Sequence, residues 1–154
     1  MESDLVFKNG HHLVIILNHT IKSLLKHAQL GQMDTEAAGV LIGERREGHI
    51  IINKISEPGP GDIRTRSSVN RVSPHHQELV YSEFRNSKGT QQYIGEWHTH
   101  PENHPTPSPL DKRSWMQEMD QDGTLITAIV GRKSIWAGKV VNRKVISLNC
   151  LNRF

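Results

Sequence analysis

A histidine pair and a following aspartate in residues 97–115 (WHTHPENHPTPSPLDKRSW) have the types and spacing of metal ligands. His98 and His100 are two positions apart, so on a strand their side chains leave the same face, about 7 Å apart along it. Asp111 adds a carboxylate further on. Two imidazoles and one carboxylate suit zinc, and three protein ligands leave a fourth position for water, as in catalytic zinc sites. The segment therefore predicts a metal centre capable of hydrolysis.

A hydrolase built on such a centre also needs a proton acceptor and a group that stabilises negative charge. Zinc lowers the pKa of bound water to about 7, and a base must still take the proton and pass it to the leaving amine. Glu36 is the candidate for this base. Ser108 lies three residues before Asp111, where its hydroxyl can stabilise an oxyanion or cap a helix, and the two roles are compatible.

The elements around the histidines are predicted to bring the ligands together. Residues 91–100 (QQYIGEWHTH) read as a strand that ends on the histidine pair. Residues 101–109 contain four prolines and are expected to be irregular. Residues 108–111 (SPLD) resemble a helix start, with a serine cap, a proline at the first helical position and an acid three residues after the cap. This helix is predicted to run to about Met119.

Apolar and β-branched runs predict the strands of a sheet. They lie at residues 5–7, 12–17, 36–42, 49–55, 124–130, 135–141 and 145–151. Asn9-Gly10, between the first two runs, predicts a hairpin because both central positions of such a turn need positive φ. Glu36 stands at the start of the third strand, and residues 57–66 read as an irregular surface loop.

Two further helices are predicted before the proline-rich segment. Asn18 is expected to cap a helix that stops at Gly31. Ser73 is expected to cap another, with Pro74 at its first position, that runs to about Ser87. Strands and helices that alternate before strands cluster indicate an α/β (α+β) layered domain, a mixed sheet flanked by helices.

Length and composition favour one soluble domain over residues 1–154, long enough to bury a core without disulfides. Cys150 is the only cysteine, read as a buried small residue, and this excludes cysteine zinc ligands. Neither a secretion signal nor an apolar run of about 20 residues is visible, so we expect a cytoplasmic protein without membrane contact. The net charge of +3 is scattered and does not support nucleic-acid binding. The clearest local excess, Arg64, Arg66 and Arg71, is a solvated loop face or a docking patch for an acidic partner.

Three segments together resemble the JAMM (MPN+, JAB domain) motif of zinc metalloproteases: EAAGVLIG from Glu36, HTHP from His98 and SPLD from Ser108. The resemblance covers most of the chain and implies the JAB/MPN architecture, which is cytidine deaminase-like, with one zinc ion per chain. It implies that His98, His100 and Asp111 are the zinc ligands. It also implies that Glu36 is the general base and acid, and that Ser108 polarises the carbonyl and stabilises the oxyanion.

The resemblance further implies an isopeptidase or peptidase that cuts after the C-terminus of a ubiquitin-like protein, or of a protein handled like one. Residues 95–115 are most similar to the stand-alone JAMM peptidases of type II CBASS anti-phage operons, which release a cGAS-like nucleotidyltransferase from its conjugates. The expected partner then has an extended C-terminal tail, which we place at a sheet edge near residues 57–72 by strand addition. Two alternatives stay open: maturation of a small sulfur-carrier-like protein, and a non-catalytic scaffold of the same fold. The sequence favours no oligomeric state.

Other aromatic residues and histidines near the motif receive structural interpretations. Trp97 and Trp115 flank the ligands and are expected to pack and fix them rather than to form a substrate platform. His104, within the proline-rich segment, is expected to be exposed to solvent. His75 and His76 are expected to be a surface pair.

Overall fold

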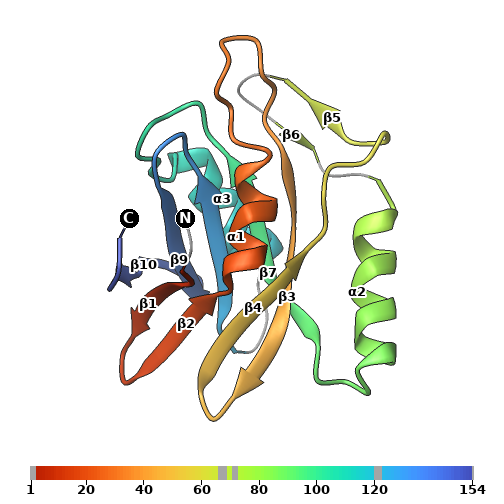
Figure 1. Cartoon of the computed structure of the whole chain (residues 1–154), viewed down its shortest axis with the longest axis vertical. Coiled ribbons are helices and arrows are strands. Elements are labelled where there is room, and N and C mark those ends of the chain that lie inside the picture. Colours follow the sequence, from red (N-terminus) through yellow and green to blue (C-terminus); the bar gives the residue numbers. More distant parts are fainter. Residues whose placement is uncertain (1–2, 66–68, 71–72, 120–122, 154) are drawn as a thin grey trace.

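The computed structural model describes residues 3–65, 69–70, 73–119 and 123–153 (Figure 1). In chain order the elements are β1 (Leu5–Asn9), β2 (His12–Ile16), α1 (Asn18–Leu25), β3 (Ala38–Arg46), β4 (His49–Ile55), β5 (Ile63–Arg64), β6 (Val69–Asn70), α2 (His75–Asn86), β7 (Gln92–Thr99), α3 (Pro109–Glu118), β8 (Leu125–Val130), β9 (Ile135–Val141), β10 (Lys144–Ser147) and β11 (Asn149–Cys150). Within these ranges, nine strands form one sheet in the order β10-β9-β8-β7-β3-β4-β2-β1-β11. The pairs β2·β4 and β7·β8 are parallel and the others antiparallel, so the sheet is mixed, as predicted.

The two outermost strands of the sheet, β10 and β11, are consecutive in the chain and separated only by Leu148. β10 pairs with β9, whereas β11 pairs with β1, where Phe7 lies opposite Cys150. The sheet therefore curls until its edges approach each other, and the ends of the chain lie near one another (Figure 1). The single strand predicted for residues 145–151 is wrong, because the chain changes partner at Leu148, which is buried and donates its N–H to the carbonyl of Ala137.

Helices cover both faces of the sheet. α1 lies in front of the sheet in Figure 1, and α3 lies behind it. The main core includes Ile21 and Leu24 of α1, and Trp97 of β7 faces the same side. A smaller cluster forms under α3 around Trp115 and Met119. Successive residues of β7 thus point to opposite faces of the sheet. The predicted ligand His98, next to Trp97, therefore points to the α3 side.

The start and end of α1 differ from the prediction. Leu17 occupies the N-cap position and no side chain caps the helix. Asn18 is instead the first helical residue, and its N–H donates to the Asp4 carboxylate. The helix ends at Leu25 rather than near Gly31, because the next N–H groups bond to carbonyls three residues back and tighten the last turn.

α2 stands beside β3 and β7 and also lacks the predicted cap. Pro74 has helical dihedral angles but occupies the N-cap position, so the helix starts at His75, one residue later than predicted, and no side chain caps it. The hydroxyl of Ser73 bonds to a histidine instead. The only buried residue of α2 is not an apolar one but His76.

The strand and loop boundaries around the site also need correction. The predicted hairpin at the start of the chain is confirmed, although its two central residues are Gly10 and His11, of which only Gly10 has a positive φ, +63°. β3 begins at Ala38, so Glu36 precedes the strand. Residues 57–66, expected to be irregular, include β5, which pairs with β6 in a separate two-stranded sheet.

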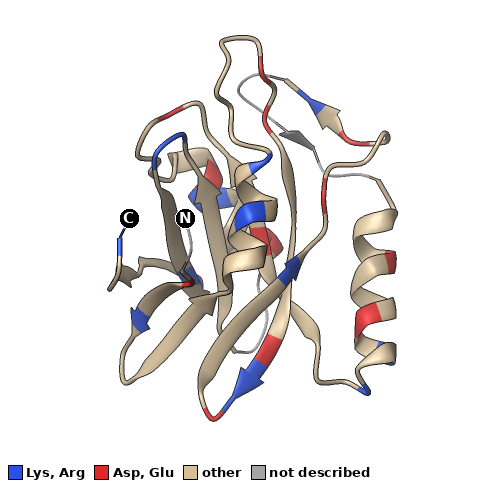
Figure 2. Cartoon of the chain, viewed as in Figure 1, with Lys and Arg blue, Asp and Glu red and all other residues tan. Residues whose placement is uncertain are grey.

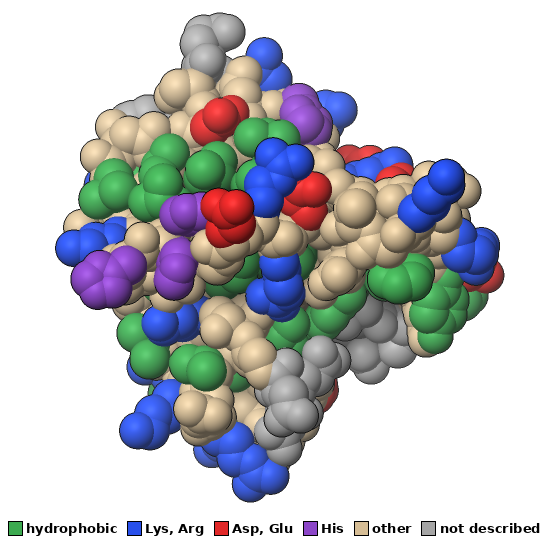
Figure 3. Space-filling view, turned by 90° about the horizontal axis from the view of Figure 1, so that it is seen from below, with side chains coloured by type: hydrophobic (Ala, Val, Ile, Leu, Met, Phe, Trp, Pro, Cys, Tyr) green, Lys and Arg blue, Asp and Glu red, His purple; other side chains and the backbone are tan. Residues whose placement is uncertain are grey.

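Charged residues are spread over many elements of the described chain (Figure 2). On the end of the molecule seen in Figure 3, Lys and Arg side chains stand apart between acidic, neutral and hydrophobic ones. Arg66 and Arg71 lie outside the described residues, so the predicted arginine patch is represented by Arg64 alone. None of the described helices has the length and apolar character that crossing a bilayer requires.

Candidate active site

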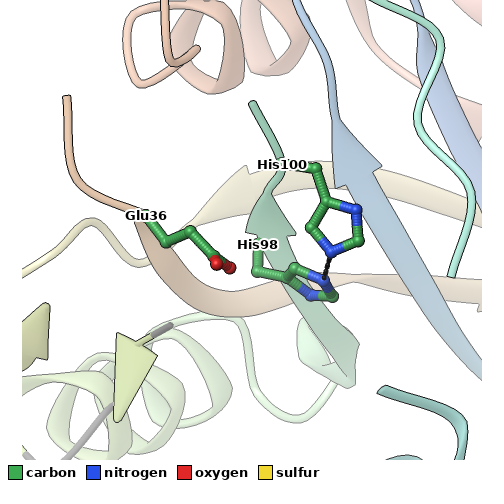
Figure 4. Close-up of side chains that lie close together, drawn as sticks. All are labelled: Glu36, His98 and His100. Atoms are coloured by element: carbon green, nitrogen blue, oxygen red, sulfur yellow. Dashed lines mark hydrogen bonds between the residues drawn. The ribbon is translucent and has the colours of Figure 1, made fainter. Parts of the chain in front are cut away.

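The histidine pair leaves the end of β7 in the middle of the sheet. His98 lies opposite Ala38 of β3 on one side and Ile129 of β8 on the other. Thr99, between the histidines, points to the opposite face, as predicted, where it is fully buried. The Nε2 atoms of His98 and His100 are 3.1 Å apart (Figure 4). Both rings contact α3, His98 through Trp115 and His100 through Asp111.

Asp111 reaches the two histidines from the first turn of α3. Its Oδ1 lies 3.4 Å from Nε2 of His98 and its Oδ2 lies 3.1 Å from Nε2 of His100. Burial alone would raise the pKa of Asp111, but hydrogen bonds with His100 and His98 hold it well below its usual range. Burial lowers the pKa of His100, but the hydrogen bond and charge of Asp111, with a hydrogen bond to Glu102, raise it above its usual value. The three predicted ligands are thus brought together from β7 and α3.

The helix cap fixes Asp111 in this place. Ser108 Oγ accepts the N–H of Asp111 at 3.0 Å, and Asp111 Oδ2 accepts the N–H of Ser108 at 2.9 Å. This is the predicted capping box, with Pro109 following the cap. The Ser108 hydroxyl accepts one hydrogen bond in this arrangement and keeps its own proton free to donate.

Glu36 approaches the histidines from the segment before β3. Its carboxylate and ring nitrogens of His98 and His100 all lie within 4.8 Å of one another, and it points toward them (Figure 4). The residue is 6% exposed. Burial raises the pKa of Glu36 to about 7, while the charge of His100 opposes this rise and that of Asp111 adds to it. A carboxyl group of this kind can exchange protons near neutral pH.

The ligand atoms fit a metal ion of the size of zinc. Ligands about 2.0–2.1 Å from a tetrahedral zinc lie about 3.3–3.4 Å from one another. The two Nε2 atoms of His98 and His100 are 3.1 Å apart, Asp111 Oδ1 lies 3.4 Å from the first, and Asp111 Oδ2 lies 3.1 Å from the second. The two Nε2 atoms face each other and the Asp111 carboxylate at close distance. A proton or a cation must lie between them, because the lone pairs of the two nitrogens and the carboxylate oxygens would otherwise repel one another. The donor set therefore matches a metal site.

Glu102 is a site residue that the motif did not reveal. His100 Nδ1 lies 2.8 Å from Glu102 Oε1, so Nδ1 donates to the carboxylate and Nε2 is the nitrogen that faces Asp111 and His98. Carboxylates commonly orient metal-binding histidines in this way and raise their basicity. An acid two residues after the second histidine was the available signal.

The aromatic residues that flank the motif are packing residues, as predicted. Trp97 is 1% exposed and donates Nε1–H to the carbonyl of Ser56 on the face opposite the site. Trp115 is 5% exposed, contacts the His98 ring with centroids 5.7 Å apart, and stacks on Trp136. The predicted exposure of His104 is confirmed as well.

Comparison with known proteins identifies the family of this chain. A family model described as prokaryotic homologs of the JAB domain matches residues 17–146. The chain belongs to this family. It is 49% identical over 137 residues to a CD-NTase/cGAS isopeptidase from Vibrio cholerae, covering 88% of both chains. It is 42% identical over 135 residues to a protein of the same name from Escherichia coli, covering 88% of this chain and 86% of the relative.

The fold agrees with the family. The solution structure of protein DSY2949 from Desulfitobacterium hafniense superimposes with a TM-score of 0.63 at 20% identity, covering 86% of this JAB-domain chain and 87% of the other. The predicted fold class and the resemblance to the JAMM family are confirmed. With relatives named isopeptidases and a cluster of metal-ligating side chains, the chain is a peptidase of the JAMM type.

A second polar cluster lies beside the site, and the prediction for it is wrong. His76, expected on the surface, is 1% exposed. Its Nδ1 lies 2.6 Å from Ser56 Oγ and its Nε2 lies 2.8 Å from Asp62 Oδ2. Arg64, expected to be solvated or to dock an acidic partner, is exposed, and its Nε also donates to the carbonyl of Glu36 at 2.7 Å.

Proposed function

We propose that this JAB-domain protein is a zinc-dependent isopeptidase that hydrolyses the bond after the C-terminus of a ubiquitin-like protein or of a protein handled like one. Its substrate would be a conjugated cGAS-like nucleotidyltransferase of the CD-NTase class, released in a cytoplasmic anti-phage system of the type II CBASS kind. We further take residues 1–154 as one JAB/MPN domain. The names of the relatives from V. cholerae and E. coli support the substrate class.

The observation that carries the proposal is the convergence of a buried glutamate on a metal-fitting histidine pair. His98, His100 and Asp111 would hold one zinc ion per chain. When bound, zinc would supply Lewis acidity toward the attacking water and the scissile carbonyl. A site that only binds metal does not need an acid–base group. Glu36 supplies such a group within 4.8 Å of the ring nitrogens, which favours catalysis.

Glu36 would act as the general base and then as the general acid. Its carboxylate takes a proton from the attacking water and delivers it to the nitrogen of the leaving amine. For that, the group must change protonation state near working pH, and burial already brings the pKa of Glu36 to about 7.

Ser108 would stabilise the negative charge that develops on the carbonyl oxygen. The N–H of Asp111 holds Ser108 Oγ in place, and the hydroxyl can turn its proton toward the carbonyl oxygen. The position at the helix N-terminus favours negative charge as well.

The substrate tail would lie extended along the segment that contains β5. Glu36 N–H donates to the carbonyl of Thr65, just after β5, so this segment borders the catalytic glutamate. Ile63 of β5 is 62% exposed, which leaves an apolar side chain available beside an extended peptide. Strand addition would supply main-chain hydrogen bonds for a tail of this kind.

The test is cleavage of defined conjugates by the zinc-loaded protein. One conjugate joins the C-terminus of a CD-NTase to a lysine of a carrier protein, and a panel of small sulfur-carrier-like proteins carries C-terminal fusions. Mass spectrometry identifies the bond that is cut. We expect cleavage of the CD-NTase conjugate at the tail terminus by wild type and no cleavage by Glu36→Ala.

The other outcomes point to the alternatives. Cleavage of the sulfur-carrier fusions alone would assign the protein to carrier maturation. Full anti-phage activity of Glu36→Ala in cells would instead establish a non-catalytic scaffold. Purified protein without stoichiometric zinc would exclude the zinc enzyme.

A further inference from the structure

Glu36 is held in place by residues outside β3. The strand begins at Ala38, so no sheet neighbour fixes the backbone of Glu36 by regular pairing. Its N–H donates to the carbonyl of Thr65 at 2.6 Å, and its carbonyl accepts from Nε of Arg64 at 2.7 Å. Both backbone polar groups of the glutamate are thus bonded by two consecutive residues of one segment.

That segment is in turn anchored by Asp62. The Asp62 side chain is fully shielded from solvent. Its Oδ2 accepts the N–H of Gly59 at 3.0 Å, and its Oδ1 accepts the N–H of Ser73 at 2.8 Å. One carboxylate therefore ties both ends of the segment that contains β5 and β6 and bonds to His76 of α2 as well.

His76 connects Asp62 to the main sheet. With Asp62 ionised, His76 Nε2–H donates to the carboxylate, and Nδ1 accepts the hydroxyl proton of Ser56. Ser56 Oγ then accepts the N–H of Val40 in β3 at 2.8 Å. This assignment gives each of these polar atoms a partner of the right kind with a neutral imidazole.

The order Ser56, His76, Asp62 resembles a nucleophilic triad, but burial excludes that role. Ser56 and His76 are each 1% exposed, so no substrate reaches the hydroxyl. Packing is close around it: a Cβ added at Gly39 would lie 2.1 Å from the Ser56 carbonyl oxygen. A buried, fully bonded network of this kind fixes the relative position of the elements it joins.

We propose that Arg64 and Thr65 are positioning residues for Glu36, and that the Ser56–His76–Asp62 network holds them in register with β3. These hydrogen bonds form a continuous path. It starts at Val40 of β3, passes through the Ser56–His76–Asp62 network and the segment with Arg64 and Thr65, and ends at Glu36, four positions before Val40 in the sequence. This inference rests on the proposed role of Glu36 as the catalytic base. Displacing its carboxylate by a fraction of an ångström to 1 Å would slow the proton transfer while His98, His100 and Asp111 stay in place.

The test compares two variants with matched controls. Arg64→Ala removes an exposed side chain that bonds to Glu36, and His76→Gln breaks the network. Arg85→Ala on the exposed surface of α2 and His11→Gln in the β1–β2 turn are the controls. The first readout is hydrogen exchange of the Glu36 amide by NMR in zinc-free protein. The second is kcat and KM for the CD-NTase conjugate.

In both variants we expect the Glu36 amide to exchange at least about tenfold faster while amides of the β3 centre keep their protection. We expect kcat to fall about tenfold or more, since misplacement by ~1 Å can cost up to ~100-fold, with zinc content unchanged in both variants. KM should stay unchanged in His76→Gln, because His76 is buried away from the proposed path of the substrate tail. The double variant should lose no more than the larger single variant, because both act through one element. Arg64→Lys should recover part of the loss.

Unchanged Glu36 exchange and unchanged kcat in Arg64→Ala would overturn the proposal, and so would control variants with equal effects. If His76→Gln fails to fold, the results for Arg64→Ala alone test the positioning proposal. A wild type that cleaves no conjugate would refute the proposed function, while the exchange measurement would still test the positioning of Glu36.

Discussion

Ala38 of β3 and His98 of β7 lie opposite each other in the antiparallel register. Glu36 is two residues before Ala38 and His100 is two residues after His98, so both leave the same end of this strand pair. The hydrogen bond from Thr99 N–H to the carbonyl of Ala37 continues the pairing in between. One strand pairing therefore joins the acid–base residue to the histidine ligands despite their distance in sequence.

The first prediction separates proton transfer from metal binding. Glu36→Gln keeps the size of the side chain but removes its ability to exchange protons. We expect kcat to fall by about 10²–10⁴-fold, the range typical of general acid–base groups. Zinc content, measured by atomic absorption, should stay at one ion per chain. Parallel loss of zinc would show that Glu36 is a ligand rather than the base.

The second prediction separates the two roles of Ser108. Ser108→Gly and Ser108→Ala both remove the hydroxyl, and each should lower kcat by about 10²-fold or more. Their stabilities should differ, because glycine at an N-cap costs only a few tenths of a kcal/mol whereas alanine costs about 1 kcal/mol. Urea unfolding of the zinc-free proteins measures this. Normal kcat in Ser108→Gly would leave Ser108 as a helix cap only.

The third prediction concerns the orientation of His100. Glu102→Gln weakens the acceptor of the His100 Nδ1–H, so the ring is less well aligned and Nε2 is less basic. We expect about 10–100-fold weaker zinc binding, measured by competition with a chromophoric chelator. Glu118→Gln, an exposed position near the end of α3, is the control. Equal zinc affinity in both variants would contradict the orienting role.

The fourth prediction uses the pH dependence of stability. Burial alone would raise the pKa of Asp62, but the N–H groups of Gly59 and Ser73 together with His76 lower it to about 2 from 3.8. A folded-state pKa below the unfolded one stabilises the fold above the unfolded value. The contribution, on the order of 2 kcal/mol, should disappear as pH falls from about 4 to 2.

Asp62→Asn tests this expectation in zinc-free protein, so that release of the metal does not intervene. The variant should be less stable than wild type at pH 7, and the difference should shrink toward pH 2. Asp34→Asn, at an exposed position, is the control. A difference that is constant with pH would show that the Asp62 charge does not contribute.

Local patterns predicted much of the metal site and its helix. The spacing of His98 and His100 sets their common face, and the SPLD segment specifies a capping box that needs only neighbours in sequence. The family pattern singled out Glu36, which its own surroundings in sequence do not. Its approach to His100 depends on the pairing of β3 with β7, which is a tertiary contact.

The missed residues depend on partners distant in sequence. Adjacent histidines in a polar segment are usually exposed, and His76 is buried only because Ser56 and Asp62 satisfy both of its nitrogens. Asn18 and Ser73 have good capping side chains, but α1 starts one residue earlier than predicted and α2 one residue later, and Ser73 Oγ bonds to His75. Residue type alone does not encode these choices.

The change of strand partner at Leu148, after which β11 pairs with β1, has a consequence for biosynthesis. Until Asn149 and Cys150 pair with Lys8 and Phe7, β1 presents an unpaired edge to its surroundings. Such an edge recruits strands from other molecules. Nascent or truncated chains that lack these two residues would then self-associate and precipitate, even though every proposed catalytic group has already been synthesised.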